Sequence, residues 1–380
     1  MVVNVGKRKD VLIGGHQRTT LYKKKGITEV DVMVPSRELT KDEEKKLNLR
    51  LNKNVGSWDY EKLKEIDLTL LLEVGFDEND MQITFDDVEV LDDDYNVAKK
   101  LKEIKTARIK PGEVWQLGRH RVMCGDSTDD LNVSKLMGKD LADVVYCDPP
   151  YNIGLDYDKG TEGKKSTYGG SYTGKKDKKK DAQYGEFVDA TIKNAIAHAK
   201  PNHHIFYWCD EAYIWLLQML FKDNGIMSNR VCLWIKNNSF PKPQVAFNKV
   251  YEPCVYGTRG KPYLNKAYNG LNEILNKEIS LGNQGQEDIM DMLNLWLVRR
   301  DDTNSYQHPT QKPVTLAEKP LKRVSAPGHV VLDLFGGSGS TLIACEQIGR
   351  TALLMEQDPI FATVIIDRWE VFTNQKAKKI

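Results

Sequence analysis

Four consecutive residues, Asp148-Pro149-Pro150-Tyr151, carry the strongest chemical signal in the sequence. They follow an apolar run over residues 141–147 that predicts a short buried strand, so they lie where that strand ends. The two prolines stiffen the backbone and prevent helix or strand from continuing. The turn therefore presents a carboxylate, carbonyl acceptors and an aromatic ring, which are groups able to hold an amine-bearing base. A plain proline turn with an aspartate cap is the alternative.

A second signal is a glycine-rich turn near the other end of the chain. The apolar run 330–335 leads into residues 336–340 (GGSGS), and a helical pattern follows. Strand, glycine-rich turn and helix bring backbone close to a nucleotide-like ligand. The next strand, residues 351–355, ends at Glu356, 20 residues after Gly336, where a carboxylate can bind ribose hydroxyls. The glycine spacing is not G-x-G-x-x-G and no phosphate-binding lysine follows, so a sugar-bearing ligand without phosphates is favoured.

These segments resemble the amino-group DNA methyltransferases that use S-adenosylmethionine. The resemblance rests on D-P-P-Y at residues 148–151, L-D-L-F-G-G-S-G-S at 332–340 and M-E-Q-D at 355–358. Because the base-binding motif comes first, the chain resembles the permuted β group of that family. H-P-T-Q-K-P at residues 308–313 matches a signature of that group.

Two further segments are similar to motifs of the β group, W-I-K-N at residues 234–237 and E-P at 252–253. Position 251 is Tyr where the group has His, so the role of that His does not carry over. The resemblance covers roughly residues 112–372, and the ordered set of motifs is more specific than any one motif.

The resemblance implies roles for individual residues. Asp148, Pro149, Pro150 and Tyr151 are the expected catalytic residues. The expected cofactor-binding residues are Asp126, Thr310, Lys312, Asp333, Phe335, Gly336, Gly337, Ser338, Gly339 and Glu356. For Asp126, which would accept from the adenine of the cofactor, a helix N-cap is the alternative reading.

The implied reaction is methyl transfer from S-adenosylmethionine to the exocyclic N6 of adenine in double-stranded DNA. Asp148 and the Pro149 carbonyl would accept the hydrogens of the amine and free its lone pair, while Tyr151 would stack on the extruded base. An aspartate rather than a serine at the head of the turn favours adenine by resemblance. Cytosine N4 is the alternative target, since it presents a similar amine.

The expected fold class is α/β, a Rossmann-like doubly wound sheet. Ligands of such sheets bind at the carboxyl ends of the strands, where the strand order reverses. We therefore expect the strands ending at Phe335 and Cys147 to be neighbours, so that both loops open onto one cleft. The methyltransferase domain is expected over residues 99–380.

Two segments are expected to contact DNA. A lysine-rich loop over residues 156–182 hangs from the base-binding turn, and a target-recognition region is expected over residues 258–300. Cations there could neutralise phosphates, although a solvated loop and a plain connecting subdomain are the alternatives. The expected DNA-binding residues are Lys164, Lys165, Lys175, Lys176, Lys178, Lys179, Lys180, Arg299 and Arg300.

Residues 1–98 are expected to form a separate segment that ends in an acidic connector over residues 77–94. V-L-I-G-G-H-Q-R at residues 11–18, followed by a helical pattern, resembles the box of ParB-like domains, here truncated at the start of the chain. A ParB-like DNA-binding or nucleotide-switch protein with an inactive methyltransferase body is therefore the alternative function. A docking or scaffold role for the segment is favoured.

The amino-acid composition narrows the possible functions only modestly. The 380 residues carry 55 Lys and Arg against 54 Asp and Glu, so no overall basic field points to nucleic acid. No apolar run suits a membrane span, and the polar start is not a signal peptide. Six scattered cysteines without C-x-x-C, and adjacent histidines at 203 and 204 on a predicted strand, favour no metal site. The expected location is the cytoplasm, nucleoid-associated on DNA; a homodimer is compatible with the sequence and a restriction-enzyme partner stays open.

Overall fold

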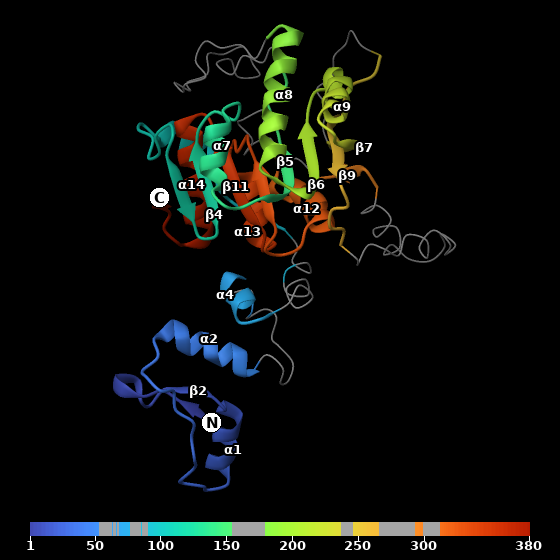
Figure 1. The fold of residues 1–380 in the computed structure, drawn as a ribbon. Coiled ribbons are helices and arrows are strands. Elements are labelled where there is room, and N and C mark those ends of the chain that lie inside the picture. The colour runs from blue at the N-terminus through green and yellow to red at the C-terminus, as the bar shows by residue number, and fades with distance from the viewer. Residues whose placement is uncertain are drawn as a thin grey trace, which may run out of the picture. The chain divides into compact units, whose positions relative to one another are not determined.

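The computed structural model describes residues 1–52, 63, 66, 68–76, 85, 90–153, 179–236, 246–265, 293–298 and 312–380. The chain divides into two compact units, Met1–Asp87 and Val88–Ile380. Figure 1 shows the elements of both units.

The first unit has short strands and polar helices. Its described elements are β1 (Val2–Val3), η1 (Gly6–Arg8), β2 (Leu12–Gly14), α1 (His16–Lys24), α2 (Lys41–Asn52) and α4 (Leu68–Glu73). A capping box starts α2, because the Glu43 N–H donates to Thr40 Oγ1 and the Thr40 N–H donates to a Glu43 carboxylate oxygen. The buried Asn4 side chain ties the β1–η1 connection to the Leu39 backbone and to Glu44.

The second unit holds one mixed sheet that, among the described residues, has 10 strands in the order β12-β3-β4-β11-β10-β5-β6-β8-β7-β9. Its strands are β3 (Val114–Leu117), β4 (His120–Cys124), β5 (Ala142–Cys147), β6 (Ala199–Trp208), β7 (Met227–Ile235), β8 (Tyr251–Arg259), β9 (Leu295–Leu297), β10 (Val330–Asp333), β11 (Thr351–Glu356) and β12 (Lys378–Lys379). The central strands β4, β11, β10, β5 and β6 are parallel, whereas β3, β8 and β12 pair antiparallel to their neighbours.

Helices cover both faces of this sheet (Figure 1). They are α6 (Val97–Glu103), α7 (Asp130–Met137), α8 (Asp181–Ala197), η2 (Glu211–Tyr213), α9 (Ile214–Asp223), η4 (Val314–Ala317), α12 (Glu318–Val324), α13 (Ser340–Gln347) and α14 (Pro359–Thr373). Alternate residues of β5 point to opposite sides, as a strand requires. Val144 and Tyr146 join the core under α12, α13 and α14, while Val145 and Cys147 join the core under α7, α8 and α9. The expected α/β layering is confirmed.

The second unit begins before the expected boundary at residue 99. Val90 is only 1% exposed and belongs to its core. The Asp92 carboxylate accepts hydrogen bonds from the Val314 and Thr315 N–H groups, and Asp93 pairs with Arg368. The interpretation of this stretch as a connector or solvated edge is therefore wrong for Asp92 and Asp93, whose charges cap η4 and pair with α14.

The cysteines and the two adjacent histidines all lie in the interior of the protein. The six cysteines are all buried and free. Both adjacent histidines are buried: a ring nitrogen of His203 lies 2.6 Å from the Lys200 carbonyl oxygen, and one of His204 lies 2.6 Å from that of Tyr263. Within the described ranges no cluster of His, Cys, Asp or Glu is arranged to hold a metal ion. Of the helices described, none is long and apolar enough to cross a membrane.

Candidate active site

The two motif-bearing strands are neighbours in the centre of the sheet. In the parallel pair β10·β5, Val331 lies opposite Val144 and Leu332 opposite Val145. The Leu334 nitrogen, directly after the end of β10, lies 3.4 Å from the sulfur of Cys147, the last residue of β5. From β10 the chain continues through α13 to β11 on one side, and from β5 it continues through α8 to β6 on the other. The strand order reverses here, so the expected adjacency of the two turns is confirmed.

The turn after β5 is fixed by hydrogen bonds from its own tyrosine and from α8. The Tyr151 hydroxyl donates to Asp148 Oδ1 at 2.7 Å. The Tyr184 hydroxyl donates to the Pro150 carbonyl at 3.0 Å. Pro149 is buried, whereas the Asp148 side chain keeps 27% of its surface exposed. The carboxylate is therefore held in one orientation, with part of its surface exposed.

Asn152 closes this turn in a left-handed conformation, with φ 58°. Its side-chain oxygen accepts from the Lys179 N–H at 2.5 Å, and its amide donates to the Lys179 carbonyl at 3.2 Å. The same amide donates to the Tyr213 hydroxyl at 2.8 Å. Asn tolerates positive φ better than most residues, and here its side chain joins the two ends of the intervening segment.

Lys312 links the two turns. Its ammonium lies 2.5 Å from Asp148 Oδ2 and 2.8 Å from the Tyr151 hydroxyl, and 4.7 Å from the centre of the Trp208 ring. Its carbonyl accepts from the Ser340 hydroxyl at 2.7 Å, at the start of α13. Lys312, which the sequence predicted to bind the cofactor, thus places its charge on the turn after β5, while its backbone carbonyl contacts the start of α13.

Two further charged residues complete this cluster. Glu252 Oε2 lies 3.4 Å from both the Lys312 ammonium and the Tyr151 hydroxyl, and Glu252 Oε1 pairs with Lys236. They come from the E-P and W-I-K-N segments, for which the sequence predicted no role. Because side-chain contacts between β7, β8 and the turn depend on tertiary structure, only that motif resemblance could have indicated them.

The charges of the cluster shift one another's ionisation. Burial raises the pKa of Asp148, and the Lys312 ammonium and the Tyr151 hydroxyl oppose that rise. Burial lowers the pKa of Lys312, but Asp148 and Glu252 together raise it, so the ammonium stays charged. The pKa of Glu252 is lowered to about 2, because Lys312 and Lys236 outweigh its burial.

The glycine turn after β10 offers an open cradle. Gly337 has φ 50° and Gly339 has φ 84°, a region that favours glycine. A Cβ on Gly336 would come within 2.9 Å of Ile365, which packs beneath the turn. A Cβ on Gly337 would find only the Phe335 carbonyl oxygen, at 3.9 Å, so the turn is open on that side.

Two buried carboxyl groups face this turn. Glu356 accepts from the Gly337 N–H at 2.8 Å and from the Asp358 N–H at 2.9 Å. Asp333 accepts from the Phe335 N–H at 3.0 Å. Burial raises the pKa of Glu356 to about 7, and burial likewise raises the pKa of Asp333 to about 7. Both carboxyls are thus close to their titration point at neutral pH.

Arg368 of α14 supports the turn from behind. Its guanidinium donates to the Ser338 carbonyl at 2.9 Å and pairs with Asp93. The side chains of Arg368 and Asp93 are only 2% and 9% exposed. Sequence reasoning gave neither residue a role, because nothing local marks a pair separated by 275 positions.

Asp126 lies at the same edge of the sheet. The Gly125 N–H donates to the Glu356 carbonyl at 3.0 Å, so the ends of β4 and β11 meet beside it. Asp126 is exposed and accepts from the Thr128 N–H at 2.9 Å. The N-cap of α7 is Asp129 and not Asp126, so the capping alternative for Asp126 is wrong.

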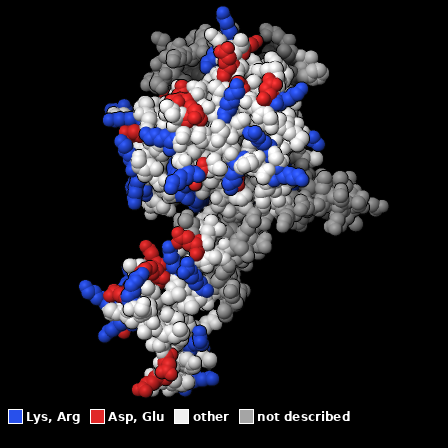
Figure 2. Space-filling view, viewed as in Figure 1, with Lys and Arg blue, Asp and Glu red and all other residues white. Residues whose placement is uncertain are grey.

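Most expected DNA contacts lie outside the described residues. The DNA-binding candidates outside the described residues are Lys164, Lys165, Lys175, Lys176, Lys178, Arg299 and Arg300. One cofactor candidate, Thr310, also lies outside them. Lys179 is described, and its ammonium lies 4.1 Å from the centre of the Phe187 ring. Lys180 is the exposed N-cap of α8, so the end of the expected lysine-rich loop is already helical from Asp181. Figure 2 shows Lys and Arg interspersed with Asp and Glu on the described surface in view.

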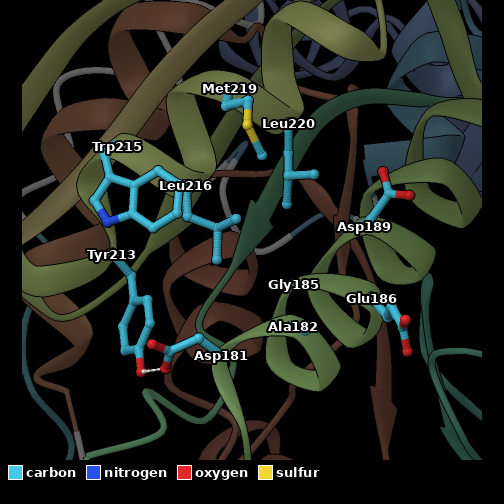
Figure 3. Close-up of a pocket in the computed structure, with 10 residues that line it drawn as sticks. All are labelled: Asp181, Ala182, Gly185, Glu186, Asp189, Tyr213, Trp215, Leu216, Met219 and Leu220. Atoms are coloured by element: carbon cyan, nitrogen blue, oxygen red, sulfur yellow. Dashed lines mark hydrogen bonds between the residues drawn. The ribbon is translucent and has the colours of Figure 1, made fainter.

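A separate pocket of about 380 Å³ lies between α8 and α9. Figure 3 shows Trp215, Leu216 and Met219 on one wall and acidic side chains, including Asp181 and Glu186, on another. Such carboxylates repel phosphates, so this pocket does not suit DNA. Its Tyr213 hydroxyl, which accepts from the Asn152 amide, donates to Asp181 at 2.9 Å.

Comparison with known proteins identifies the family to which the chain belongs. The chain belongs to the DNA methylase family (N6_N4_Mtase), which matches residues 142–367. The methyl donor of this family is S-adenosylmethionine, as expected from the sequence. The open cradle at Gly337 and the carboxyls of Glu356 and Asp333 fit its uncharged ribose.

Two similar relatives are type II methyltransferases. The chain is 24% identical over 246 residues to M.HpaI of Haemophilus parainfluenzae, covering 61% of this chain and 68% of that protein. It is 24% identical over 254 residues to M2.DpnII of Streptococcus pneumoniae, covering 64% and 88%.

Solved structures with similarity include the M1.HpyAVI–SAM complex, with 18% identity, TM-score 0.43, and coverage of 65% of this chain and 98% of that one. Another is the cytosine-N4-specific PvuII DNA methyltransferase, with 14% identity, TM-score 0.46, and coverage of 71% and 94%.

Proposed function

We propose that this DNA methylase transfers a methyl group to the exocyclic N6 of adenine at a specific sequence in double-stranded DNA. The observation that supports it most is the position of the Asp148 carboxylate, at the end of β5 and beside the strand that carries the glycine turn. An acceptor for an amine and a cradle for the methyl donor then open at one edge of the sheet.

Asp148 has the chemistry to activate an aromatic amine. The lone pair of an exocyclic amine is delocalised into its ring, which makes the nitrogen a poor nucleophile. A carboxylate that accepts one N–H, with the Pro149 carbonyl accepting the other, draws the nitrogen toward tetrahedral geometry and frees the lone pair. Tyr151 supports this role by donating to Asp148 and offers its ring to the extruded base.

S-adenosylmethionine supplies a methyl group already activated by its sulfonium. The N6 lone pair would form the new carbon–nitrogen bond as the carbon–sulfur bond breaks. The electrons of the carbon–sulfur bond would go to the sulfur and neutralise its charge. One N6 proton then leaves the methylated amine toward Asp148 and solvent. The chain contributes alignment, which accounts for much of the acceleration in such a transfer.

The remaining assignments belong to the same proposal. The β-group order of motifs, a ParB-like origin of the first unit, and phosphate contacts by the lysine-rich segment and by Arg299 and Arg300 follow from the sequence resemblance. The catalytic residues are Asp148, Pro149, Pro150 and Tyr151, and Asp126, Asp333 and Glu356 bind the cofactor. The proposed location is the cytoplasm.

Nucleoside mass spectrometry tests the target base. Duplex DNA treated with the protein and S-adenosylmethionine should contain N6-methyladenine, and sequencing that detects modified bases should place it at one motif. N4-methylcytosine as the sole product would keep the methylase assignment and overturn adenine. C5-methylcytosine would overturn the amine chemistry altogether, because that reaction needs a cysteine nucleophile.

A further inference from the structure

The Lys312 ammonium binds the carboxylate oxygen of Asp148 that the amino group of a target base would need as its acceptor. It lies 2.5 Å from Asp148 Oδ2, and the other carboxylate oxygen already accepts from Tyr151. An ammonium and an exocyclic amino group are both nitrogen donors of similar size. The two groups therefore compete for the same side of Asp148.

Lys312 has a second carboxylate within reach. Glu252 Oε2 lies 3.4 Å from the same ammonium, on β8. The Lys312 side chain is 12% exposed, so its charge needs a carboxylate partner in any position it takes. A short movement toward Glu252 would release Asp148 and keep the ammonium paired.

The backbone of Lys312 can stay in place during such a movement. Its carbonyl accepts from Ser340 at the start of α13, which holds the residue on the glycine-turn side of the site. Only the side chain, with its four rotatable bonds, has to change. The ammonium also lies against the ring of Trp208, a surface along which a cation can slide while remaining attracted.

On the basis of the proposed function, we propose that Lys312 is a positioning residue for Asp148. Without a base, its ammonium holds the carboxylate oriented and ionised; when a base enters, the ammonium gives way to the base's amino group and moves to Glu252. Asp148 is thus kept ready by a lysine that stands in for the substrate amine.

The pKa of Asp148 shows whether the Lys312 ammonium keeps the carboxylate ionised when no base is bound. Burial raises that pKa, and Lys312 is the nearest cation that lowers it. The other ionisable groups around Asp148 are Tyr146, Cys147, Tyr151, Cys209, Glu252, Cys254 and Asp333. Lys236, the other cation of the cluster, pairs with Glu252 and not with Asp148. Loss of the Lys312 ammonium should therefore raise the pKa of Asp148 further.

The first experiment follows this titration by ¹³C NMR of the full chain labelled at aspartate carboxyls. Lys312→Met should move the Asp148 titration up by about one to three pH units, and Lys312→Arg should leave it close to wild type. Lys200→Met is the matched control, because Lys200 pairs with Asp143 near the opposite end of β5. It should leave the Asp148 titration unchanged. An unchanged Asp148 titration in Lys312→Met would overturn the proposal.

The second experiment follows base entry with 2-aminopurine placed beside the target adenine, in the presence of S-adenosylhomocysteine. In Glu252→Gln the ammonium has no second carboxylate, so extrusion of adenine should weaken about tenfold. In a Lys312→Met background the same substitution should have little effect. A target purine that lacks the amino group should be insensitive in both backgrounds.

The outcomes separate this proposal from the function it rests on. Equal effects of Glu252→Gln with and without Lys312 would mean that Lys312 does not move between the carboxylates. A wild-type protein that extrudes and methylates cytosine instead would overturn the adenine assignment, while the aspartate titration would still decide whether Lys312 controls Asp148.

Discussion

The Gly337 N–H donates a 2.8 Å hydrogen bond to Glu356 Oε2, which joins the glycine turn to the end of the neighbouring strand β11. The bond holds the carboxylate at the mouth of the turn, where a sugar hydroxyl can reach its remaining lone pairs. One carboxyl group therefore fixes the turn and is the acceptor that we propose for the cofactor ribose.

Cofactor affinity should depend on pH through this carboxyl. Burial raises the pKa of Glu356 to about 7, and hydroxyl donors prefer its ionised form. Affinity for S-adenosylmethionine should therefore be highest above this pKa and fall by up to about tenfold per pH unit below it. Calorimetry between about pH 5.5 and 8.5 measures this. Glu356→Gln should weaken binding and flatten the slope. The slope that remains should disappear when Asp333→Asn is added to Glu356→Gln, because the pKa of Asp333 lies in the same range.

Replacement of Asp148 should separate methylation from cofactor binding. Asp148→Ala removes the amine acceptor, so methylation should be lost, while cofactor affinity changes by no more than about tenfold, ~1.4 kcal/mol. Radiolabelled methyl transfer and calorimetry give the two values. Asp148→Asn, which keeps the shape and loses the charge, should be almost as inactive. Comparable methylation by either variant would remove Asp148 from the reaction.

A side chain at Gly337 should have the opposite effect. Gly337→Leu would fill the open side of the turn and force a branched residue into φ 50°, so cofactor binding itself should be lost. Gly112→Leu is a matched control, since Gly112 has φ 82° and no atom within 4 Å of its Cβ. Both variants should lose about 1–2 kcal/mol of unfolding free energy from backbone strain. Only the first should lose the cofactor; if both bind it normally, the cradle is wrongly assigned.

Deletion inside the lysine-rich segment tests DNA contact. Removal of residues 160–178 keeps Lys179, which Asn152 binds, and should weaken DNA affinity and flatten its dependence on salt. Each phosphate that is no longer neutralised should remove about 0.9 from the log–log slope. Fluorescence anisotropy at several salt concentrations measures this slope. Unchanged slope and unchanged affinity would assign the segment to solvated surface.

The buried pair of Arg368 and Asp93 should matter for stability. Arg368→Met leaves the Asp93 charge unpaired and the Ser338 carbonyl without its donor, which should cost about 3–5 kcal/mol of unfolding free energy. Denaturant titration monitored by tryptophan fluorescence measures the loss. The double variant Arg368→Met, Asp93→Leu should recover part of it, because no buried charge then remains. A neutral single variant would mean that Asp93 reaches water.

The sequence predicted the central strands and the edge of the sheet where the motifs meet, because apolar runs and turn residues are local signals. The strand ending at Cys147 and the one leading to Phe335 were placed as neighbours from the general rule for doubly wound sheets, and the structure pairs them. The expected strand over residues 351–355 is found as β11, one residue longer at Glu356.

What the sequence could not predict are contacts between charges far apart in the chain. Lys312 appeared as one letter of a motif near the glycine turn, yet its ammonium reaches Asp148, 164 positions away. Glu252 and Lys236 were visible as motif letters and gained a role only once β7 and β8 were folded beside the turn. In the same way, Asp92 and Asp93 read as part of an acidic run because their cationic and N–H partners lie more than 200 positions away.

The hydrogen bonds between the Asn152 side chain and the Lys179 backbone join the chain after β5 to the chain before α8. Because one side chain fixes both ends of the sequence between these residues, we expect that a longer or different sequence there would leave the Asp148 carboxylate in place. Doubling the length of a closed loop costs only about 0.6 kcal/mol of entropy. New DNA-reading segments could therefore be grafted between these two residues, and sequence preference could change while the chemistry of the site stays the same.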